Sequence, residues 1–293
     1  MKKTIRNNMK KITLLIVALI YVSSSSIQAQ ENSLLWQISG NGLKETSYIF
    51  GTMHILCEDS IVNNSKLKEA FTNSKTLVLE LDPTSPEVIQ EIQQLSMNPG
   101  FENIYKDLPL EDYELVDGFL KSKFGAGLEQ LGVMKPFTLT AMASMGFLTC
   151  QVPFSLETYF VNQATERNMQ IGSLETVSSQ MGIFDAIPKE DQINELIRLL
   201  KNNMGQAEMN QMIEVYLNGD LEAIHEVIYS NSLMDKYHAE ILDDRNHNWI
   251  PQLKKYISSN STFVAVGAGH LAGEMGLLSL LRKQGYNVEV VSW

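Results

Sequence analysis

Short apolar and alternating stretches along the chain predict β-strands. Residues 33–38 and 47–50 flank the turn residues Gly40, Asn41 and Gly42, a pattern that predicts a β-hairpin. The apolar run TLVLEL at 76–81 predicts an interior strand. Residues 169–174, 262–266 and 288–291 predict further strands. The strand signals therefore lie at both ends of the chain, with long segments between them.

The segments between these strands have helical periodicity. Residues 86–95, 110–123, 155–168 and 271–284 predict helices, and the apolar, Met-rich stretch 136–149 predicts a buried one. Residues 189–258 predict nearly continuous helix with breaks near 218–219 and at Pro251, and Gly285 is expected to end the last helix. No linker rich in Pro, Gly or Ser divides the chain. We therefore expect a single α/β domain over residues 30–293.

The first 29 residues have the pattern of a secretory signal peptide. Five basic residues precede an apolar core at 12–22, and a Ser-rich stretch ends in the small residue Ala29. A membrane-spanning helix needs about 20 apolar residues, so this core is short for one, and an uncleaved anchor is the weaker alternative. We predict an exported protein, periplasmic or secreted, without stable membrane insertion after signal cleavage.

Composition and charge exclude some classes of protein. The chain has 293 residues, 44% of them hydrophobic, and a net charge of −11. Removing residues 1–29 leaves 18 basic residues against 34 acidic ones, a net charge of −16. That charge argues against a nucleic-acid partner. Cys57 and Cys150 are too few for a disulfide scaffold; they could form one disulfide after export, and two separate buried thiols fit the sequence equally well.

One motif occurs twice, near the two ends of the chain. Gly51 begins the sequence GTMH and Gly267 begins GAGH, and each motif directly follows a predicted strand. Ligands of open α/β sheets bind at the carboxyl ends of strands, and glycine permits a sharp turn or a close approach there. We therefore expect His54 and His270 to lie at the same edge of the sheet. Gly269 belongs to the second motif.

A carboxylate belongs to the same edge. Glu80 lies inside the apolar run at 76–81, where burial is costly unless the charge is paired or bound to a metal. Two histidines and a carboxylate are a common ligand set for catalytic divalent metals, which activate a bound water. The sequence therefore predicts a metal site of His54, Glu80 and His270. The alternative is that Glu80 points outward from an edge strand.

Two other interpretations of histidine and glycine positions are weaker. His225, His238 and His247 lie in predicted helices without a partner at ligand spacing, so we expect surface or packing roles. The second motif also fits the dinucleotide pattern G-x-G-x-x-A. However, the printed sequence continues for only a few residues after Glu289, too few for further βαβ units, so we do not expect NAD binding.

Taken together, five segments resemble the TraB/PrgY/GumN family, which includes the Tiki metalloproteases. The segments follow the family order over essentially the whole chain after the signal: 51–54, 77–82, 172–176, 244–246 and 267–291. The family is also similar to erythromycin-esterase-like and haem-binding ChaN-like proteins. The resemblance implies an α/β fold with a central mixed sheet and long helical insertions.

The resemblance also implies residue roles. The family histidines match His54 and His270 as metal ligands with Glu80. Glu175 matches a glutamate that we expect to act as general base, although an extra Ser173 precedes it here. Arg245 would stabilise an oxyanion, and Asn246 would orient a carboxylate or the substrate. Glu157 is a secondary candidate.

The predicted function is an exported metal-dependent hydrolase, a peptidase that acts on an unidentified peptide or protein. The cofactor would be a divalent metal: Mn, Co or Zn. The alternative is a non-catalytic protein that binds haem or a peptide in the same two-histidine cleft. The sequence does not predict the oligomeric state.

Overall fold

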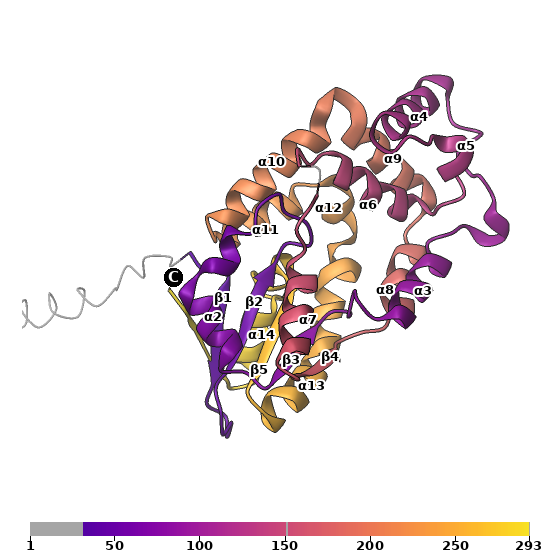
Figure 1. Ribbon diagram of the computed structural model, residues 1–293. Coiled ribbons are helices and arrows are strands. Elements are labelled where there is room, and N and C mark those ends of the chain that lie inside the picture. Colours follow the sequence, from indigo (N-terminus) through magenta and orange to yellow (C-terminus); the bar gives the residue numbers. More distant parts are fainter. Residues whose placement is uncertain (1–31, 151, 293) are drawn as a thin grey trace, which may run out of the picture. The chain divides into compact units, whose positions relative to one another are not determined.

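The computed structural model describes residues 32–150 and 152–292, and the predicted signal peptide lies outside these residues. Its strands form one mixed sheet in the order β4-β3-β5-β2-β1-β6 (Figure 1). The described strands are β1 (Leu35–Ser39), β2 (Ser47–Thr52), β3 (Thr76–Leu79), β4 (Gln170–Ser173), β5 (Thr262–Gly267) and β6 (Asn287–Val290). Five of the predicted strands extend at most two residues beyond these bounds, and the second hairpin strand runs on to Thr52.

The register of the sheet brings the two repeated motifs side by side. β1 and β2 form the predicted hairpin, and β6 pairs antiparallel with β1. The other pairs, β2·β5, β3·β5 and β3·β4, are parallel. Thr52 lies opposite Gly267, and Leu79 lies opposite Ala265. Four neighbouring parallel strands therefore end at one edge.

Helices make up most of the remaining chain. The described helices are α2 (Ser65–Thr72), α3 (Pro86–Leu95), α4 (Leu110–Phe124), α5 (Leu128–Leu131), α6 (Pro136–Gly146), α7 (Leu156–Glu166), α8 (Val177–Ala186), α9 (Lys189–Leu200), α10 (Met204–Leu217), α11 (Leu221–Tyr229), α12 (Ser232–His238), α13 (Asp244–Ser259) and α14 (Leu277–Lys283), with 3-10 turns at Ser60–Asn63, Pro99–Phe101, Lys201–Asn203 and Ala268–His270 and a π-helical segment at Ala239–Asp243. Among the described residues, no helix combines the length and apolarity needed to cross a membrane.

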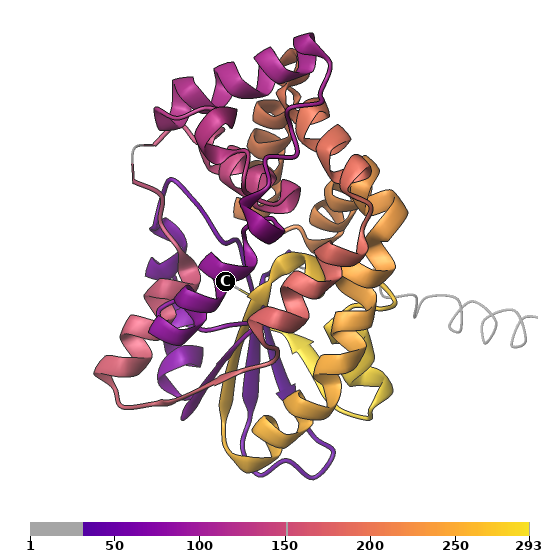
Figure 2. The ribbon, with the colours of Figure 1, turned by 90° about the vertical axis from the view of Figure 1, so that its right-hand side faces the viewer.

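The main core lies on both faces of the sheet. Phe71 of α2 and Phe160 of α7 pack against Phe263 of β5, with ring centroids 5.2 and 5.0 Å away. In Figure 2, α2 and α7 lie on one side of the sheet and α13 and α14 on the other. Trp249 and Leu253 of α13 are fully buried in the same core. Apolar burial on both faces is the main stabilising contribution to this arrangement.

A second hydrophobic cluster lies within the long connections that leave the carboxyl edge. It joins α4, α6 and α9 around buried side chains such as Leu120, Leu139 and Leu196. A disulfide between Cys57 and Cys150, with their Cα atoms 5.5 Å apart, ties the segment after β2 to the segment before α7. This pairing resolves the alternative that the cysteine count left open.

Two sequence predictions about helices are wrong. Pro251 does not break α13, because the buried side chains on either side of it, Trp249 and Leu253, hold the helix against the core. The last helix begins at Leu277, six residues later than predicted. Gly273 has a φ of +81°, and a Cβ on Gly276 would lie 2.0 Å from the carbonyl oxygen of Ala272, so the segment after His270 is a tight turn.

Candidate functional site

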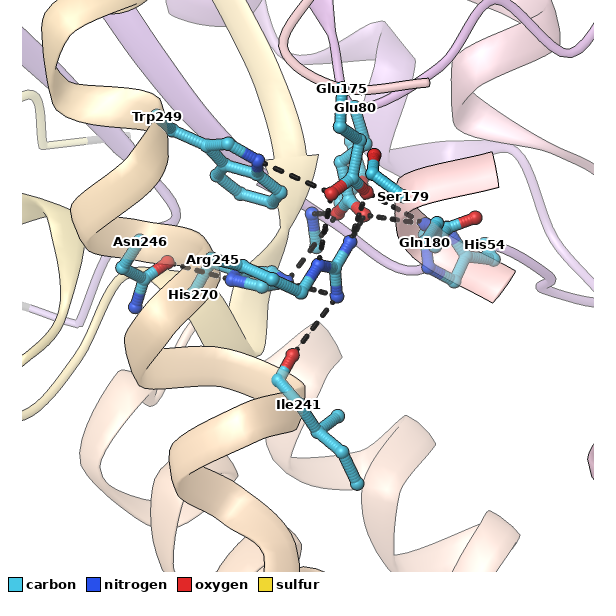
Figure 3. A network of polar contacts seen from close by, with 12 residues as sticks. His54, Glu80, Glu175, Ser179, Gln180, Ile241, Arg245, Asn246, Trp249 and His270 are labelled. Carbon is cyan, nitrogen blue, oxygen red and sulfur yellow. Dashed lines mark hydrogen bonds and ion pairs between the residues drawn. The ribbon is translucent and has the colours of Figure 1, made fainter. Parts of the chain in front are cut away.

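The carboxyl ends of four neighbouring strands carry the polar side chains that the sequence singled out. Glu175 follows β4, Glu80 follows β3, His270 follows β5 and His54 follows β2. Figure 3 shows these side chains gathered around one arginine, Arg245, which comes from α13. Because parallel strands end at the same edge, residues far apart in the sequence meet here.

Arg245 is the centre of this network. Its Nη2 donates to Glu80 Oε2 at 2.6 Å and to Glu175 Oε1 at 2.5 Å, and its Nε donates to Glu175 Oε2 at 3.2 Å. Its Nη1 donates to the carbonyl oxygen of Ile241 at 3.1 Å, and the guanidinium lies 4.9 Å from the Trp249 ring centroid. One buried cation is therefore shared by two carboxylates.

The two carboxylates have opposite pKa shifts. Burial opposes ionisation of Glu80, but the positive charges around it and the backbone N–H of Gly267, 2.8 Å from Oε1, lower its pKa to about 2. Burial raises the pKa of Glu175 despite its bonds to Arg245. Glu80 is thus the fixed anion, and Glu175 is the carboxylate that takes a proton more readily.

His270 is buried and held as a neutral ring. Asn246 Nδ2 donates to the carbonyl oxygen of Met275 at 2.9 Å, which directs Asn246 Oδ1 toward His270 Nδ1, 2.7 Å away. Nδ1 therefore carries the proton, and Nε2 accepts from Arg245 Nη1 at 3.2 Å. Burial, joined by the charge of Arg245, lowers the pKa of His270 to about 3. Asn246 thus orients an imidazole, and within residues 32–150 and 152–292 its side chain has no hydrogen bond to a carboxylate.

His54 lies in a different environment, on the open side of the site. Its Nδ1 lies 2.9 Å from Glu157 Oε1, and the same oxygen accepts from Thr52 Oγ1 at 2.6 Å. The hydrogen bond to Glu157 and the negative charge of that carboxylate raise the pKa of His54 to about 9. The side chain is 68% exposed. Glu157, a secondary candidate from the sequence, is therefore the partner that orients His54.

The three predicted metal ligands converge on Gly267. A methyl carbon on this glycine would lie 3.2 Å from Glu80 Oε1, 3.6 Å from His270 Cδ2 and 3.9 Å from His54 Nε2. The absence of a side chain thus leaves a small space among the ligands.

The other two motif glycines serve packing. A Cβ on Gly51 would meet Ala268 Cα at 3.0 Å, and one on Gly269 would meet Ile228 Cδ1 at 2.6 Å. Of the three glycines, Gly267 alone borders the ligands.

The donor atoms fit a divalent metal by chemistry. Each histidine has Nδ1 tied to an oxygen acceptor, which is the usual outer contact of a metal-binding imidazole. In residues 32–150 and 152–292, however, no three His, Cys, Asp or Glu side chains have the spacing to hold a metal ion together. Instead, the guanidinium of Arg245 forms hydrogen bonds with two of the predicted metal ligands, Glu80 and His270 Nε2.

Three side chains of the site were not predicted. Gln180 of α8 donates to Glu175 Oε1 at 3.0 Å and to Glu80 Oε2 at 3.4 Å. Trp249 Nε1 donates to Glu175 Oε2 at 3.4 Å. Trp249 lies four residues after Arg245 in a predicted helix, and this spacing indicates that the two side chains share one face of the helix. The hydroxyl of Tyr216 in α10 donates to the carbonyl oxygen of Gly51 at 2.9 Å, a contact that no sequence spacing indicates.

Fold and site together define an α/β protein whose imidazole, carboxylate and guanidinium groups meet at the carboxyl edge of a mixed sheet. Residues 34–290 match the TraB/PrgY/gumN family. The chain belongs to this family, as the motifs predicted. No solved structure matches the chain significantly.

Several relatives that the chain matches are named metalloproteases. It is 23% identical to metalloprotease TIKI2 of Danio rerio, over 89% of this chain and 61% of the relative. It is 24% identical to metalloprotease TIKI1 of Homo sapiens, over 89% of this chain and 62% of the relative. The match to the metalloprotease TIKI homolog of Nematostella vectensis is 22% identical and covers 91% of this chain and 69% of the relative. The chain thus spans about three fifths of the length of the first two relatives.

Proposed function

We propose that the protein is an exported, metal-dependent hydrolase of the peptidase type, acting on a peptide or protein at the sheet edge. The observation that carries the proposal is the convergence of His54 Nε2, the His270 ring and Glu80 Oε1 on the side-chain-free space at Gly267. The names of the relatives support the reaction class. The Cys57–Cys150 disulfide and the signal-like residues 1–29 support export to an oxidising compartment.

His54, His270 and Glu80 would hold the metal. A divalent cation bound there would lower the pKa of its water and polarise the scissile carbonyl. Glu157 and Asn246 fix the two rings through Nδ1, so each Nε2 is the nitrogen left for the metal. The backbone N–H of Gly267 orients the carboxylate of Glu80 through Oε1.

The remaining residues would transfer protons and stabilise the negative charge of the reaction. Glu175 has a raised pKa, which suits a group that accepts a proton at Oε1 or Oε2 and returns it to the leaving amine. Gln180 and Trp249 hold its two oxygens in place. Arg245 is the only side-chain cation that contacts both Glu80 and Glu175 among the described residues, and it would stabilise a developing oxyanion.

Metal content and peptide hydrolysis of the purified protein test the proposal. We expect a bound divalent metal by elemental analysis, and cleavage of a peptide library, followed by mass spectrometry, that a chelator abolishes. His54→Ala and His270→Ala should each remove both properties. His247→Ala is the matched control, because His247 is exposed on α13 and lies outside the network. Equal behaviour of the wild type and both site variants would overturn the catalytic proposal.

The non-catalytic alternative and the export proposal have separate tests. If the protein binds haem instead, hemin should give a Soret shift that His54→Ala abolishes, without peptide cleavage. For export, amino-terminal sequencing of the secreted product should begin at residue 30. A product that retains residues 1–29 would overturn the export proposal.

A further inference from the structure

Arg245 engages a lone pair that a metal would need, on His270 Nε2, and the second oxygen of the ligand carboxylate, Glu80 Oε2. Its Nη1 faces His270 Nε2 at 3.2 Å, and its Nη2 contacts Glu80 Oε2 at 2.6 Å. His270 can offer only Nε2, because Nδ1 donates its proton to Asn246. A nitrogen has one lone pair, so Nε2 cannot accept from the guanidinium and bind a metal at the same time.

Arg245 also has partners that do not depend on these two contacts. Nε and Nη2 both donate to Glu175, which is a two-point contact of a guanidinium with one carboxylate. Nη1 donates to the carbonyl oxygen of Ile241, and the guanidinium stacks on Trp249. These groups can keep the cation in the site when Glu80 and His270 are released.

The buried charges explain why an internal cation is needed. The side chains of Glu80 and Glu175 are 10% and 6% exposed, and that of Arg245 is 9% exposed. Two buried carboxylates without a counter-charge would be strongly destabilising. Arg245 supplies that charge in the structure described, and a divalent cation would supply it in a loaded protein.

We propose that Arg245 is an exchangeable internal cation: it holds Glu80 and His270 Nε2 in the metal-free protein, and a divalent metal binds by displacing it from these two groups onto Glu175. The inference rests on the proposed metal function. It adds that Arg245 weakens metal binding, whereas a residue that only positions the ligands would strengthen it. The arginine would thereby keep the empty site folded and make occupancy depend on metal concentration.

Metal affinity of variants tests this competition without measuring activity. Co²⁺ is titrated into the purified full chain, with visible absorption and competition against a fluorescent chelator as readouts. We expect Arg245→Gln to bind Co²⁺ about tenfold or more tightly than the wild type, since one charged hydrogen bond no longer competes. Arg245→Lys, which keeps the charge but loses the two-point contact, should lie between them.

Arg198→Gln is the matched control. Arg198 also lies between two glutamates, Glu195 and Glu208, but outside the site. This variant should bind Co²⁺ as the wild type does, which excludes a general effect of lost positive charge.

Each outcome bears on one claim. Unchanged or weaker binding by Arg245→Gln, with binding by the wild type intact, overturns the competition and leaves the proposed function standing. No binding by any variant overturns the metal function itself. If Arg245→Gln does not fold, nitrogen NMR of the wild type replaces it. Zn²⁺ should then shift the Arg245 Nε–H and His270 Nε2 signals together, and an unmoved arginine signal overturns the proposal.

Discussion

The two G-x-x-H motifs end adjacent parallel strands, yet they place their histidines in opposite environments. The side chain of His54 is 68% exposed and bonds a carboxylate, Glu157. The side chain of His270 is 5% exposed and bonds an amide, Asn246, with an arginine on its other nitrogen. The carboxylate of Glu157 raises the pKa of His54 to about 9, whereas burial, joined by the charge of Arg245, lowers the pKa of His270 to about 3.

The difference in burial gives the histidines of the two motifs different freedom to move. His270 is built into the interior, so its ring and tautomer are fixed before any ligand arrives. His54 is held from the outside, by a partner on α7 and a disulfide a few residues away. The same four-residue pattern thus gives one rigid ligand and one adjustable ligand.

Removing the disulfide should have the largest effect and should fall mainly on the first motif. Cys57 lies three residues after His54, and Leu56 next to it pairs with Phe154, three residues before Glu157. Opening this loop in Cys57→Ser/Cys150→Ser should lower the unfolding free energy by about 4 kcal/mol. Urea unfolding measures the loss, and NMR titration should show the pKa of His54 falling toward its ordinary value.

The His270 signals serve as the internal control for this variant, because Asn246 and Arg245 hold that ring independently of the disulfide. Wild-type protein treated with a reductant should match the variant. A loss below about 1 kcal/mol, or an unmoved His54 pKa, would contradict the external support assigned to the first motif.

Asn246→Ala should have the next largest effect. Asn246 is 1% exposed, and its removal leaves His270 Nδ1–H and the carbonyl oxygen of Met275 without their partner. Unsatisfied buried groups of this kind cost about 2–3 kcal/mol. His54→Ala removes the corresponding hydrogen bond of the first motif and should cost less than about 1 kcal/mol, because that ring is exposed to solvent and Glu157 keeps its hydrogen bond from Thr52. Equal losses in urea unfolding would contradict the contrast between the motifs.

Alanine substitutions at Gly51 and Gly267, the first glycines of the two motifs, test the same difference between the motifs. A Cβ at Gly51 would press on the backbone of Ala268, so Gly51→Ala should cost about 1–2 kcal/mol of stability. A Cβ at Gly267 would meet side-chain atoms of Glu80 and the histidines at 3.2 Å or more. Gly267→Ala should therefore unfold much as the wild type does but lose Co²⁺ binding. Retained Co²⁺ binding in Gly267→Ala would show that the metal does not use this space.

The sequence predicted which residues reach the sheet edge. An apolar run followed by a polar residue places Glu80 at the end of a strand, and the repeated motif places His54 and His270 likewise. In a parallel sheet these ends meet whatever the connections between them. Local patterns and one topological rule were therefore sufficient for this part of the site.

The contacts between the polar groups could not be predicted in this way. That Arg245 lies among Glu80, Glu175 and His270 depends on how α13 packs on the sheet, which no local pattern determines. The same holds for Tyr216, whose hydroxyl crosses from α10 to Gly51. The rule that proline breaks helices fails at Pro251, because it ignores the packing of the helix on the core.

The smallest predicted effect is a difference in pH dependence between the two histidines. The folded pKa of His54, about 9, is above its ordinary 6.5, so its contribution to stability is complete below pH 6.5 and disappears as pH rises through 9. Solvent screens this exposed pair, so the alkaline loss should stay below about 1 kcal/mol.

The folded pKa of His270, about 3, is below its ordinary 6.5, so the unfolded chain binds the extra proton and stability falls as pH drops from 6.5 toward 3. Glu80, with a folded pKa of about 2, adds to the loss only below its ordinary 4.5. Urea unfolding between pH 4.5 and 6.5 therefore reports the loss from His270, against which the raised pKa of Glu175 acts in the opposite direction, and unfolding between pH 6.5 and 9 reports the loss from His54. The variants separate these contributions. His54→Gln should flatten only the alkaline slope and His270→Asn only the acid one. An alkaline slope that survives in His54→Gln would mean that another group, and not the first motif, titrates there.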